Sequence, residues 1–189
     1  KKIETGIEKK QDILKNQTKH NYVYLSLGSN LKSKYGSRVN NLKIAQLLLI
    51  SKSIKIINVS SYYETLAFPN KKDPKFINCV IKIKTELSAS DLLKIIIKIE
   101  KFIGRSRKIK NEPRVCDIDI IDYKGKAINI KKPNNLIVPH KELHKRSFVL
   151  IPLIEIEHSW THPVFFVKIS SLLDKLPVSD RKYIKKVTN

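Results

Sequence analysis

The chain has 189 residues, enough for one domain with a substantial core and too few for two domains of ordinary size. No apolar run approaches the roughly 20 residues of a membrane-spanning helix, and the opening residues lack the pattern of a signal peptide. The formal net charge is +21, but lysine is spread over the whole chain, so we interpret the charge mainly as compositional background. Two cysteines, Cys79 and Cys116, lie in apolar runs and predict reduced core thiols in a cytoplasmic protein.

The first half of the chain alternates strand-like and helix-like patterns after a charged opening segment. Residues 1–21 are expected to form a flexible tail. A strand is predicted over residues 22–27 and ends at Gly28. Apolar residues at helical spacing predict a helix over residues 40–50, and strand composition returns over residues 54–65.

A proline-containing loop separates this part from a second strand and helix. Residues 66–75 contain two prolines and several turn-forming residues, and a strand follows over residues 76–85. A helix is predicted over residues 88–102, because its apolar residues recur at helical spacing. Ser88 is suited to cap its beginning, and Gly104 is suited to end it.

The stretch from Gly104 to Ile121 combines a basic loop with an Asp-x-Asp pair in an apolar strand. Residues two apart in a strand share a face, so Asp117 and Asp119 are predicted to point the same way, about 6.5–7 Å apart along the strand. By the same alternation Asp122 is expected on the opposite face. Two carboxylates on one face repel each other unless a cation bridges them, and Mg²⁺ takes one or two carboxylates together with phosphate oxygens. The basic residues just upstream are Arg105, Arg107, Lys108, Lys110 and Arg114.

This pattern predicts a metal-dependent site for a phosphoryl group, since arginine can bind phosphate oxygens bidentately. The alternative interpretation is a solvated basic loop that precedes an edge strand with surface aspartates. The local sequence leaves both interpretations open.

Short elements are expected in the remainder of the chain. A small strand pair is predicted around residues 124–125, and short helices are predicted over residues 140–145, 147–156 and 168–176. Residues 177–189 are expected to form a C-terminal tail.

The order strand, helix, strand, strand, helix, strand indicates an α+β protein with a ferredoxin-like βαββαβ antiparallel sheet. Both long helices are expected on one face of this sheet, with extra short helices at the C-terminal end. The other face would then be free to carry a ligand. A single domain is expected over residues 22–176.

Two further clusters combine polar and aromatic residues. His140, Arg146 and Phe148 lie within nine residues, and His140 and Arg146 could face phosphate, although an ordinary helix start after a proline is the simpler explanation. Asn78 is a polar residue in an apolar strand, so it either bonds backbone or recognises the edge of a ligand. Phe76 shares its face, and together with Phe148 it could sandwich a flat heterocycle.

Six motifs in order along the chain carry a resemblance to a known family. They are Leu25-Ser26-Leu27-Gly28-Ser29-Asn30, Ser60 to Thr65, Phe76-Ile77-Asn78, Ile99 through Arg105, Pro113-Arg114 with Asp117 to Ile120, and Val138-Pro139-His140 with Arg146-Ser147-Phe148. Together they resemble the 6-hydroxymethyl-7,8-dihydropterin pyrophosphokinase family of folate biosynthesis. The resemblance covers about residues 22–176.

The resemblance implies Mg²⁺-dependent transfer of diphosphate from ATP to the hydroxymethyl group of a reduced pterin, with release of AMP. It implies two Mg²⁺ ions held by Asp117 and Asp119. The implied catalytic residues are Arg105, Arg114, Asp117 and Asp119. The implied ATP-binding residues are Arg105, Arg107, Lys108, Arg114, Ile120, His140 and Arg146. The implied pterin-binding residues are Gly28, Thr65, Leu66, Phe68, Phe76, Asn78 and Phe148.

The expected partners are therefore two small molecules, ATP and a reduced pterin, with no nucleic acid and no membrane, and a monomeric state is expected. One alternative is an RNA-binding module of the RRM type, which shares this order of elements. An RRM needs aromatic-rich motifs on its central strands, whereas the strand over residues 76–85 contains one aromatic residue. A second alternative is an inactive relative that binds pterin without transferring diphosphate.

Overall fold

The computed structural model describes residues 21–106 and 112–187. Within these residues the main sheet has six strands, and every pairing between them is antiparallel. The strand order is β5, β1, β4, β3 and β8, and β2 pairs with the far half of β4. The strands are β1 (Val23–Ser29), β2 (Lys55–Val59), β3 (Tyr63–Thr65), β4 (Phe76–Lys84), β5 (Asp117–Tyr123) and β8 (Lys185–Lys186).

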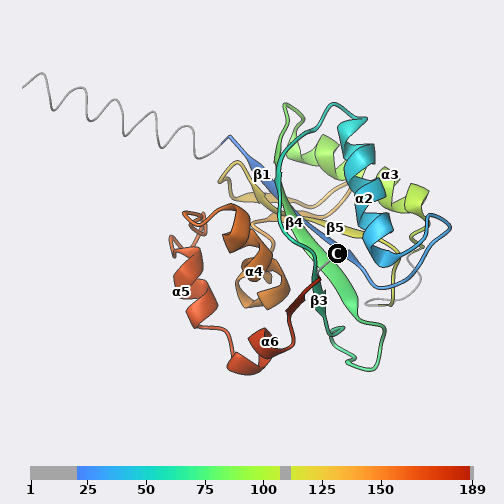
Figure 1. Ribbon diagram of the computed structural model, residues 1–189. Coiled ribbons are helices and arrows are strands. Elements are labelled where there is room, and N and C mark those ends of the chain that lie inside the picture. The colour runs from blue at the N-terminus through green and yellow to red at the C-terminus, as the bar shows by residue number, and fades with distance from the viewer. Residues whose placement is uncertain (1–20, 107–111, 188–189) are drawn as a thin grey trace, which may run out of the picture.

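The expected antiparallel α+β architecture is confirmed, and the two long helices lie on one face of the sheet (Figure 1). These helices are α2 (Arg38–Ile50) and α3 (Ala89–Ile103). The core beneath them is built from alternate residues of the strands, including Leu25 on β1, Ile81 on β4 and Ile118 on β5. Burial of this continuous apolar face is the main source of stability for such a layer.

Both helices begin where a serine satisfies a free backbone amide. The Ser37 hydroxyl accepts a hydrogen bond from Asn40 N at 3.2 Å, so α2 begins two residues earlier than the apolar pattern predicted. The Ser88 hydroxyl does the same for Asp91 N at 3.1 Å, as expected. Gly104 ends α3 in a left-handed conformation with φ of 112°, which confirms the predicted stop.

The predicted strand over residues 54–65 is wrong in one respect, because it is interrupted and forms β2 and β3. Both pieces pair with the long strand β4, one along each half. At the interruption the Ser60 hydroxyl accepts a hydrogen bond from Val80 N at 2.9 Å. A side chain thus takes a place that a backbone carbonyl holds in a regular ladder, and the pairing of the strand with β4 is interrupted there.

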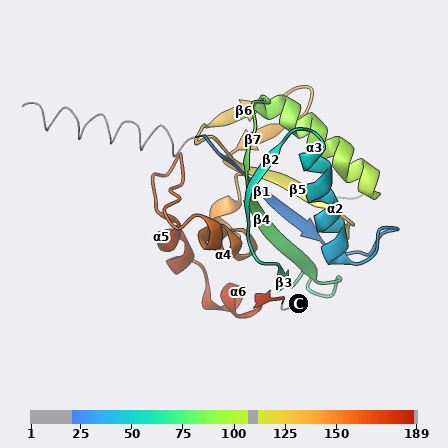
Figure 2. The same ribbon diagram turned by 45° about the horizontal axis from the view of Figure 1, so that its top comes forward.

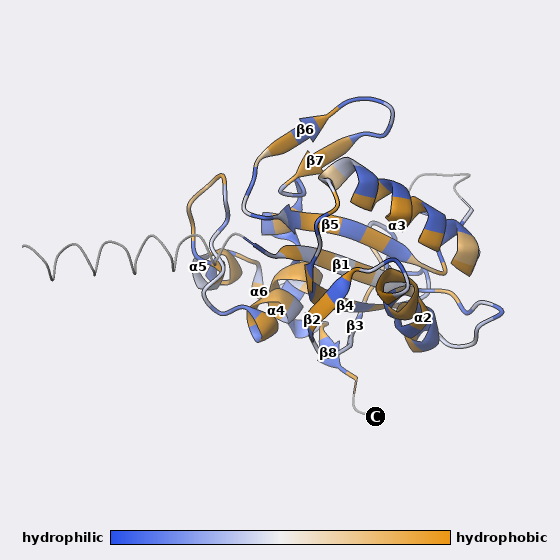
Figure 3. Ribbon diagram, turned by 90° about the horizontal axis from the view of Figure 1, so that it is seen from above, coloured by the Kyte–Doolittle hydropathy of each residue, from blue (hydrophilic) through white to orange (hydrophobic). Residues whose placement is uncertain are grey.

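The expectation that the second face is free is also wrong over part of the sheet. Two further helices, α4 (Ser147–Ile156) and α5 (Ile169–Asp174), lie on that side (Figures 1 and 3). They bury a second apolar cluster that includes Tyr24 on β1 and Val80 on β4. The ends of the strands near Gly28, in contrast, carry polar side chains on this face, as described below.

A β-bulge overturns the expected orientation of Asp122. Tyr24 pairs with Asp122 while Leu25 pairs with Ile120, so Ile121 is an extra residue in β5. The bulge reverses the alternation, and Asp122 faces the same side as Asp119. There its carboxylate accepts hydrogen bonds from Trp160 Nε1 at 2.8 Å and from Gly125 N at 2.9 Å. Asp122 therefore connects the end of β5 to the chain that carries α4 and α5.

The remaining elements are short. The strand pair predicted around residues 124–125 is wrong in position, because the hairpin forms further along the chain from β6 (Ile128–Ile130) and β7 (Leu136–Val138) and lies beside β5 (Figures 2 and 3). The expected helix over residues 140–145 is only a 3₁₀ turn, η1 (Leu143–Lys145), whereas α4 matches its predicted bounds. Part of the segment expected as a tail forms α6 (Val178–Lys182) and β8. Across the described residues, no helix combines the length and apolar character that crossing a membrane requires.

We expect replacement of Asp122 by alanine to lower the free energy of unfolding by about 1.5–3 kcal/mol, because the buried Trp160 Nε1 and Gly125 amide would lose a charged acceptor. Asp122→Asn retains an acceptor oxygen and should cost clearly less. Urea unfolding followed by tryptophan fluorescence measures both variants. Equal stability of the alanine and wild-type proteins would contradict this role.

Candidate functional site

The acidic pair of β5 lies on the sheet face opposite α2 and α3, as predicted. Asp117 is paired with Gly28 on β1, and Asp119 is paired with Ser26, so the two carboxylates share one face. Asp117 keeps 18% of its side-chain surface exposed and Asp119 keeps 36%. The two residues therefore lie at the open end of this face, beyond the part that α4 covers.

Asp117 is held between two guanidinium groups. Arg105 Nη1 donates to its Oδ1 at 2.5 Å, and Arg114 Nη2 lies 2.6 Å from its Oδ2. Burial alone would raise the pKa of Asp117, but Arg114 and Arg105 outweigh that effect and hold the pKa below its usual value. Asp117 is therefore a fixed negative charge that positions two arginines.

Arg105 is held in turn by Glu100 near the end of α3. The Arg105 guanidinium forms an ion pair with Glu100 Oε1. Glu100 is 2% exposed, and its Oε1 also accepts a hydrogen bond from Ile118 N at 2.8 Å. This buried carboxylate thus connects the last turn of α3, the start of the basic loop and the edge of β5.

Asp119 has much weaker charge compensation. Its nearest described cation is Arg146, with Nη1 3.4 Å from Oδ2. Burial and the neighbouring charge of Asp117 raise the pKa of Asp119 to about 7. A cation bound beside both aspartates would reverse this shift, because it favours the ionised form. The hard carboxylate oxygens of this pair, on one face and open at one side, fit Mg²⁺.

Each of two arginines lies between an aspartate and a phenylalanine ring. Arg114 contacts Asp117, and its guanidinium carbon is 5.0 Å from the centre of the Phe76 ring. Arg146 contacts Asp119, and its guanidinium carbon is 5.6 Å from the centre of the Phe148 ring. Cation–π contact and ion pairing together fix the plane of each guanidinium.

The predicted pterin-binding residues of β1, β3 and β4 lie close together, beside the cluster of aspartates and arginines. Asn78 pairs with Gly28 on one side and with Tyr63 on the other, and its Nδ2 donates to Thr65 Oγ1 at 2.8 Å. A Cβ atom on Gly28 would lie 3.0 Å from Asn78 Oδ1 and 3.5 Å from the Phe76 ring. Glycine at this position thus keeps the surface between the amide and the aromatic ring open.

Two other predicted residues lie on the adjoining loop. Leu66 is half-buried directly after β3, and Phe68 is 83% exposed. The loop returns to β4 through Pro74, so it borders the same group of residues from outside.

His140 follows β7 and closes another side of the region. Its backbone N donates to Ile121 O at 3.2 Å, and its Nδ1 accepts a hydrogen bond from Glu142 N at 3.2 Å, which leaves Nε2 for another partner. Burial and the charge of Arg146 lower the pKa of His140 to about 4, so the ring is neutral near pH 7.

The imidazole of His140 also borders a largely apolar pocket of about 340 Å³ between the β6–β7 hairpin and the loop after Trp160. That pocket is lined by residues 127–129, 137–141, 162, 164 and 165. The volume is suited to a small ring-shaped group.

The side chain of one predicted residue, Ile120, is directed away from the site. The Ile120 side chain is 4% exposed and points into the core under α2 and α3. Arg107 and Lys108 lie outside the described residues. Thus any contact of Ile120 with a ligand would have to use its main chain.

Asn30 is a residue of this region that the sequence did not assign. It is 3% exposed, and its side-chain amide donates to Pro74 O at 3.1 Å and accepts from Arg114 N at 2.6 Å. The sequence offered one indication of a role for Asn30, which is a polar residue shortly after the glycine that ends the predicted strand. Its partners are 44 and 84 residues away in the chain, so local sequence could not reveal them.

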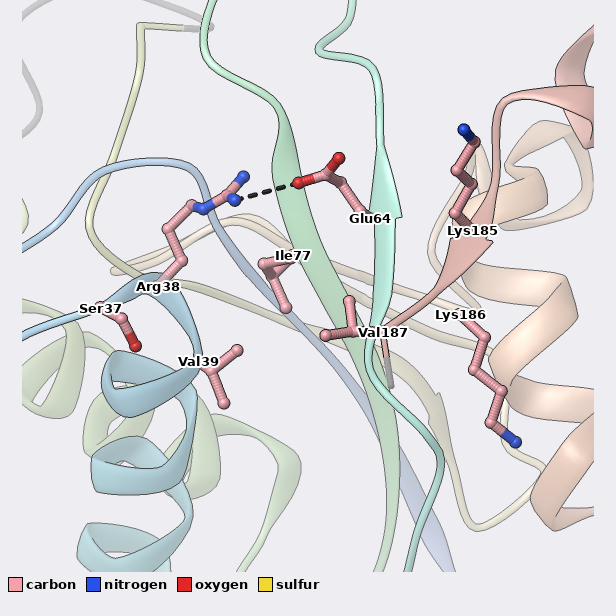
Figure 4. A pocket seen from close by; sticks show the side chains of 8 residues that line it. All are labelled: Ser37, Arg38, Val39, Glu64, Ile77, Lys185, Lys186 and Val187. Carbon is pink, nitrogen blue, oxygen red and sulfur yellow. Dashed lines mark hydrogen bonds and ion pairs between the residues drawn. The ribbon is translucent and has the colours of Figure 1, made fainter. Parts of the chain in front are cut away.

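A second pocket, of about 350 Å³, lies on the other side of the sheet and is separate from the acidic pair (Figure 4). Val39, Ile77 and Val187 form its apolar part, and Arg38 reaches across to Glu64 with an Nη2–Oε2 distance of 3.0 Å. Because Ile77 belongs to the core under the long helices, this pocket opens toward α2 and not toward the site.

The fold and the site together define a protein that can bind a polyanion through arginines and a divalent cation, next to a surface suited to a flat ligand. A family model described as 7,8-dihydro-6-hydroxymethylpterin-pyrophosphokinase (HPPK) matches residues 24–158. The chain belongs to this family.

Curated relatives agree with the family. The chain is 38% identical over 143 residues to 2-amino-4-hydroxy-6-hydroxymethyldihydropteridine pyrophosphokinase of Aquifex aeolicus, covering 76% of this chain and 84% of that protein. It is 37% identical over 158 residues to folic acid synthesis protein FOL1 of Dictyostelium discoideum, covering 84% of this chain and 23% of that protein. The chain therefore spans less than a quarter of the length of the latter relative and of fol1 from Pneumocystis carinii.

A solved structure of a Plasmodium falciparum HPPK-DHPS variant with SDX-DHP has the same fold, with a TM-score of 0.70 at 19% identity. The match covers 89% of this chain and 49% of that one. At this identity the likeness supports the architecture alone.

We expect stability to decrease on acidification from about pH 6.5 to pH 4, in part because two histidines, the half-buried His140 and the buried His162, are neutral in the fold. Burial lowers the pKa of both His140 and His162 to about 4, with contributions from Arg146 and His144 respectively. The unfolded chain therefore binds more protons over this interval, and stability falls as the pH falls.

The variant His162→Asn tests this, because its side-chain oxygen can replace the Nδ1 atom that accepts hydrogen bonds from the amides of Val164 and Phe165 but does not titrate. It should lose less stability than the wild type between pH 6.5 and pH 4 in urea unfolding. NMR titration of the ring protons should give midpoints near pH 4. A midpoint at the ordinary value for either ring would contradict the prediction.

Proposed function

We propose that this protein transfers a diphosphate group from ATP to the hydroxymethyl group of 6-hydroxymethyl-7,8-dihydropterin and releases AMP. Family membership supports this activity. The observation that carries it is the arrangement on one sheet face, where Asp117 and Asp119 each contact an arginine that also covers a phenylalanine ring. Metal, phosphate and heterocycle could be bound side by side there.

The acidic pair is our proposed metal site, with Asp117 and Asp119 as protein ligands of two Mg²⁺ ions. When bound, these ions would neutralise phosphate charge and orient the attacking and leaving oxygens. The raised pKa of Asp119 supports the assignment, because this carboxyl lacks full charge compensation within the described residues. Asp117 would serve a second role by keeping Arg105 and Arg114 directed toward the same point.

The triphosphate would lie along Arg105, Arg114, Arg146 and His140. Negative charge increases on the bridging and non-bridging oxygens as the transfer proceeds, so fixed guanidinium groups stabilise the transition state. Arg107 and Lys108 of the basic loop remain part of the proposal from sequence alone. His140 would contribute through Nε2 as a neutral donor, since its Nδ1 is already an acceptor.

Ile120 would contact the nucleotide through its main chain. The amide of Ile118 points away from β1, because it donates to Glu100. Register is continuous between these residues, so the amide and carbonyl of Ile120 should point the same way, along the open edge of β5.

The pterin would lie against Gly28, Thr65, Asn78 and the ring of Phe76, with Phe148 and the backbone from Leu66 to Phe68 around it. The side-chain amide of Asn78 donates one hydrogen bond to Thr65 Oγ1. Its carbonyl oxygen lies toward Gly28, where it could accept a hydrogen bond from a ligand. Flat aromatic faces suit a heterocycle, and an amide suits its hydrogen-bonding edge.

In the proposed reaction the hydroxymethyl oxygen attacks the β-phosphorus of ATP in line, and the bond from the β-phosphorus to the oxygen that remains on AMP breaks. The side chains position the two substrates and compensate charge. Asp119 would accept a hydrogen bond from the hydroxyl group and so polarise it, and the hydroxyl proton would leave through this carboxylate to solvent as the new O–P bond forms.

An RRM-type function has less support. The sheet face that an RRM uses for RNA is covered here by α4 over Tyr24, Val80 and Ile121. The monomeric state remains a prediction, testable by light scattering. The cytoplasmic location expected from the cysteines also remains a prediction; Cys79 and Cys116 are buried free thiols.

We expect Asp117→Asn and Asp119→Asn each to reduce AMP formation from ATP and pterin by at least about 100-fold, since each removes a charge that the metal or the arginines require. Asparagine preserves side-chain volume and so leaves no cavity, although Asp117→Asn loses the ion pairs with Arg105 and Arg114. The measurement is AMP release with Mg²⁺ by chromatography, with circular dichroism to verify folding. Wild-type turnover in both variants would refute the proposal. Pterin binding by a wild-type protein that releases no AMP would identify an inactive relative instead.

We expect Gly28→Ala to weaken pterin binding by about tenfold or more while leaving affinity for an ATP analogue nearly unchanged. The added Cβ would lie 3.0 Å from Asn78 Oδ1, and overpacking of this kind costs about 1–3 kcal/mol. Calorimetric titration with pterin, in the presence of Mg²⁺ and a non-hydrolysable ATP analogue, measures the effect. Unchanged pterin affinity would place the heterocycle elsewhere.

A further inference from the structure

Asn30 joins two segments that approach the site from different parts of the chain. It follows β1, and its side-chain amide donates to Pro74 O at 3.1 Å and accepts from Arg114 N at 2.6 Å. Its own backbone amide donates to Arg114 O at 3.0 Å. Both main-chain polar groups of Arg114 are therefore bonded to one residue.

Each partner of Asn30 is next to a residue of one proposed subsite. Pro74 is two residues before Phe76, whose ring borders the surface proposed for the pterin. Arg114 contacts Asp117 through its guanidinium group, in the cluster proposed for metal and phosphate. The same guanidinium group lies over the Phe76 side chain. Asn30, Arg114 and the segment from Pro74 to Phe76 are therefore connected in a closed circuit of contacts.

The side chain must be an amide to make both contacts. A carboxylate could accept from Arg114 N but could not donate to Pro74 O, and an alanine could do neither. The 3% exposure of Asn30 leaves little surface for a ligand, so its effect on a substrate would act through its partners.

We propose that Asn30 is a positioning residue that couples the two substrate subsites, holding Pro74 and Arg114 in one fixed relation. This inference rests on the proposed function, because it takes ATP and a reduced pterin as the ligands. Binding of nucleotide at Arg114 would then favour the bound position of the backbone that leads into Phe76, and each ligand would raise the affinity for the other by the same factor. Such coupling is reciprocal, so it can be measured from either ligand.

The test measures the affinity of a non-hydrolysable ATP analogue with Mg²⁺, with and without saturating pterin, in four full-length proteins. They are the wild type, Asn30→Ala, Asn30→Asp and Asn40→Ala; Asn40 is an exposed asparagine on α2 and serves as the matched control. In the wild type, pterin should tighten analogue binding. In Asn30→Ala this enhancement should fall by at least about fivefold, which corresponds to the free energy of one neutral hydrogen bond. Asn40→Ala should retain it.

Asn30→Asp separates the two contacts. It keeps the acceptor for Arg114 and loses the donor to Pro74, so affinity for the analogue alone should be unchanged while pterin affinity falls. A merely structural role would alter both affinities equally. In Asn30→Asp, equal losses in the affinities that the two ligands show when each binds alone would overturn the proposal. An unchanged enhancement in a folded Asn30→Ala protein, or a wild type without enhancement, would also overturn it.

If both Asn30 variants fail to fold, hydrogen exchange of the wild-type protein tests the coupling between the two subsites instead. Addition of the analogue with Mg²⁺, which binds on the Arg114 side, should slow exchange in a peptide spanning residues 71–76, and no change there would overturn the coupling. Failure of the proposed function itself is recognised separately, because the wild type would then release no AMP from ATP and pterin.

Discussion

The structure of the site depends on the charge balance around Asp117. A carboxylate at this depth is costly unless it is paired, and here two guanidinium groups provide the compensation. Each arginine is fixed from its other side, Arg105 by the buried Glu100 and Arg114 by Asn30 and the Phe76 ring. One acidic residue on β5 therefore links the end of α3, the two arginines Arg105 and Arg114 and the start of β4.

The sequence was sufficient for the features that depend on local periodicity. Alternation in β5 placed Asp117 and Asp119 on one face, and helical spacing with a serine cap and a glycine stop defined α3 almost to the residue. The family motifs brought Gly28, Thr65, Phe76 and Asn78 together although they are far apart in the chain.

Features that depend on one added residue or on distant partners could not be predicted. The extra residue Ile121 in β5 turns Asp122 to the opposite face from the one alternation predicts, and only the pairing with β1 reveals it. The interruption at Ser60 depends on a hydrogen bond to Val80, 20 residues away. The covering of the second sheet face by α4 likewise depends on tertiary packing, because the apolar residues of α4 do not by themselves indicate which surface they pack against.

The late strand β8 has a consequence for how the chain matures during synthesis. β8 pairs with Tyr63 and Glu64 of β3, and Val187 N donates to Tyr62 O at 2.8 Å, so the border of the sheet beside Thr65 is completed by residues near position 186. Until these residues leave the ribosome, that border of a nascent sheet presents unpaired backbone groups, the kind of surface on which chains adhere to one another. The last described strand, β8, therefore completes the edge of a sheet whose strand β1 is synthesised more than 150 residues earlier.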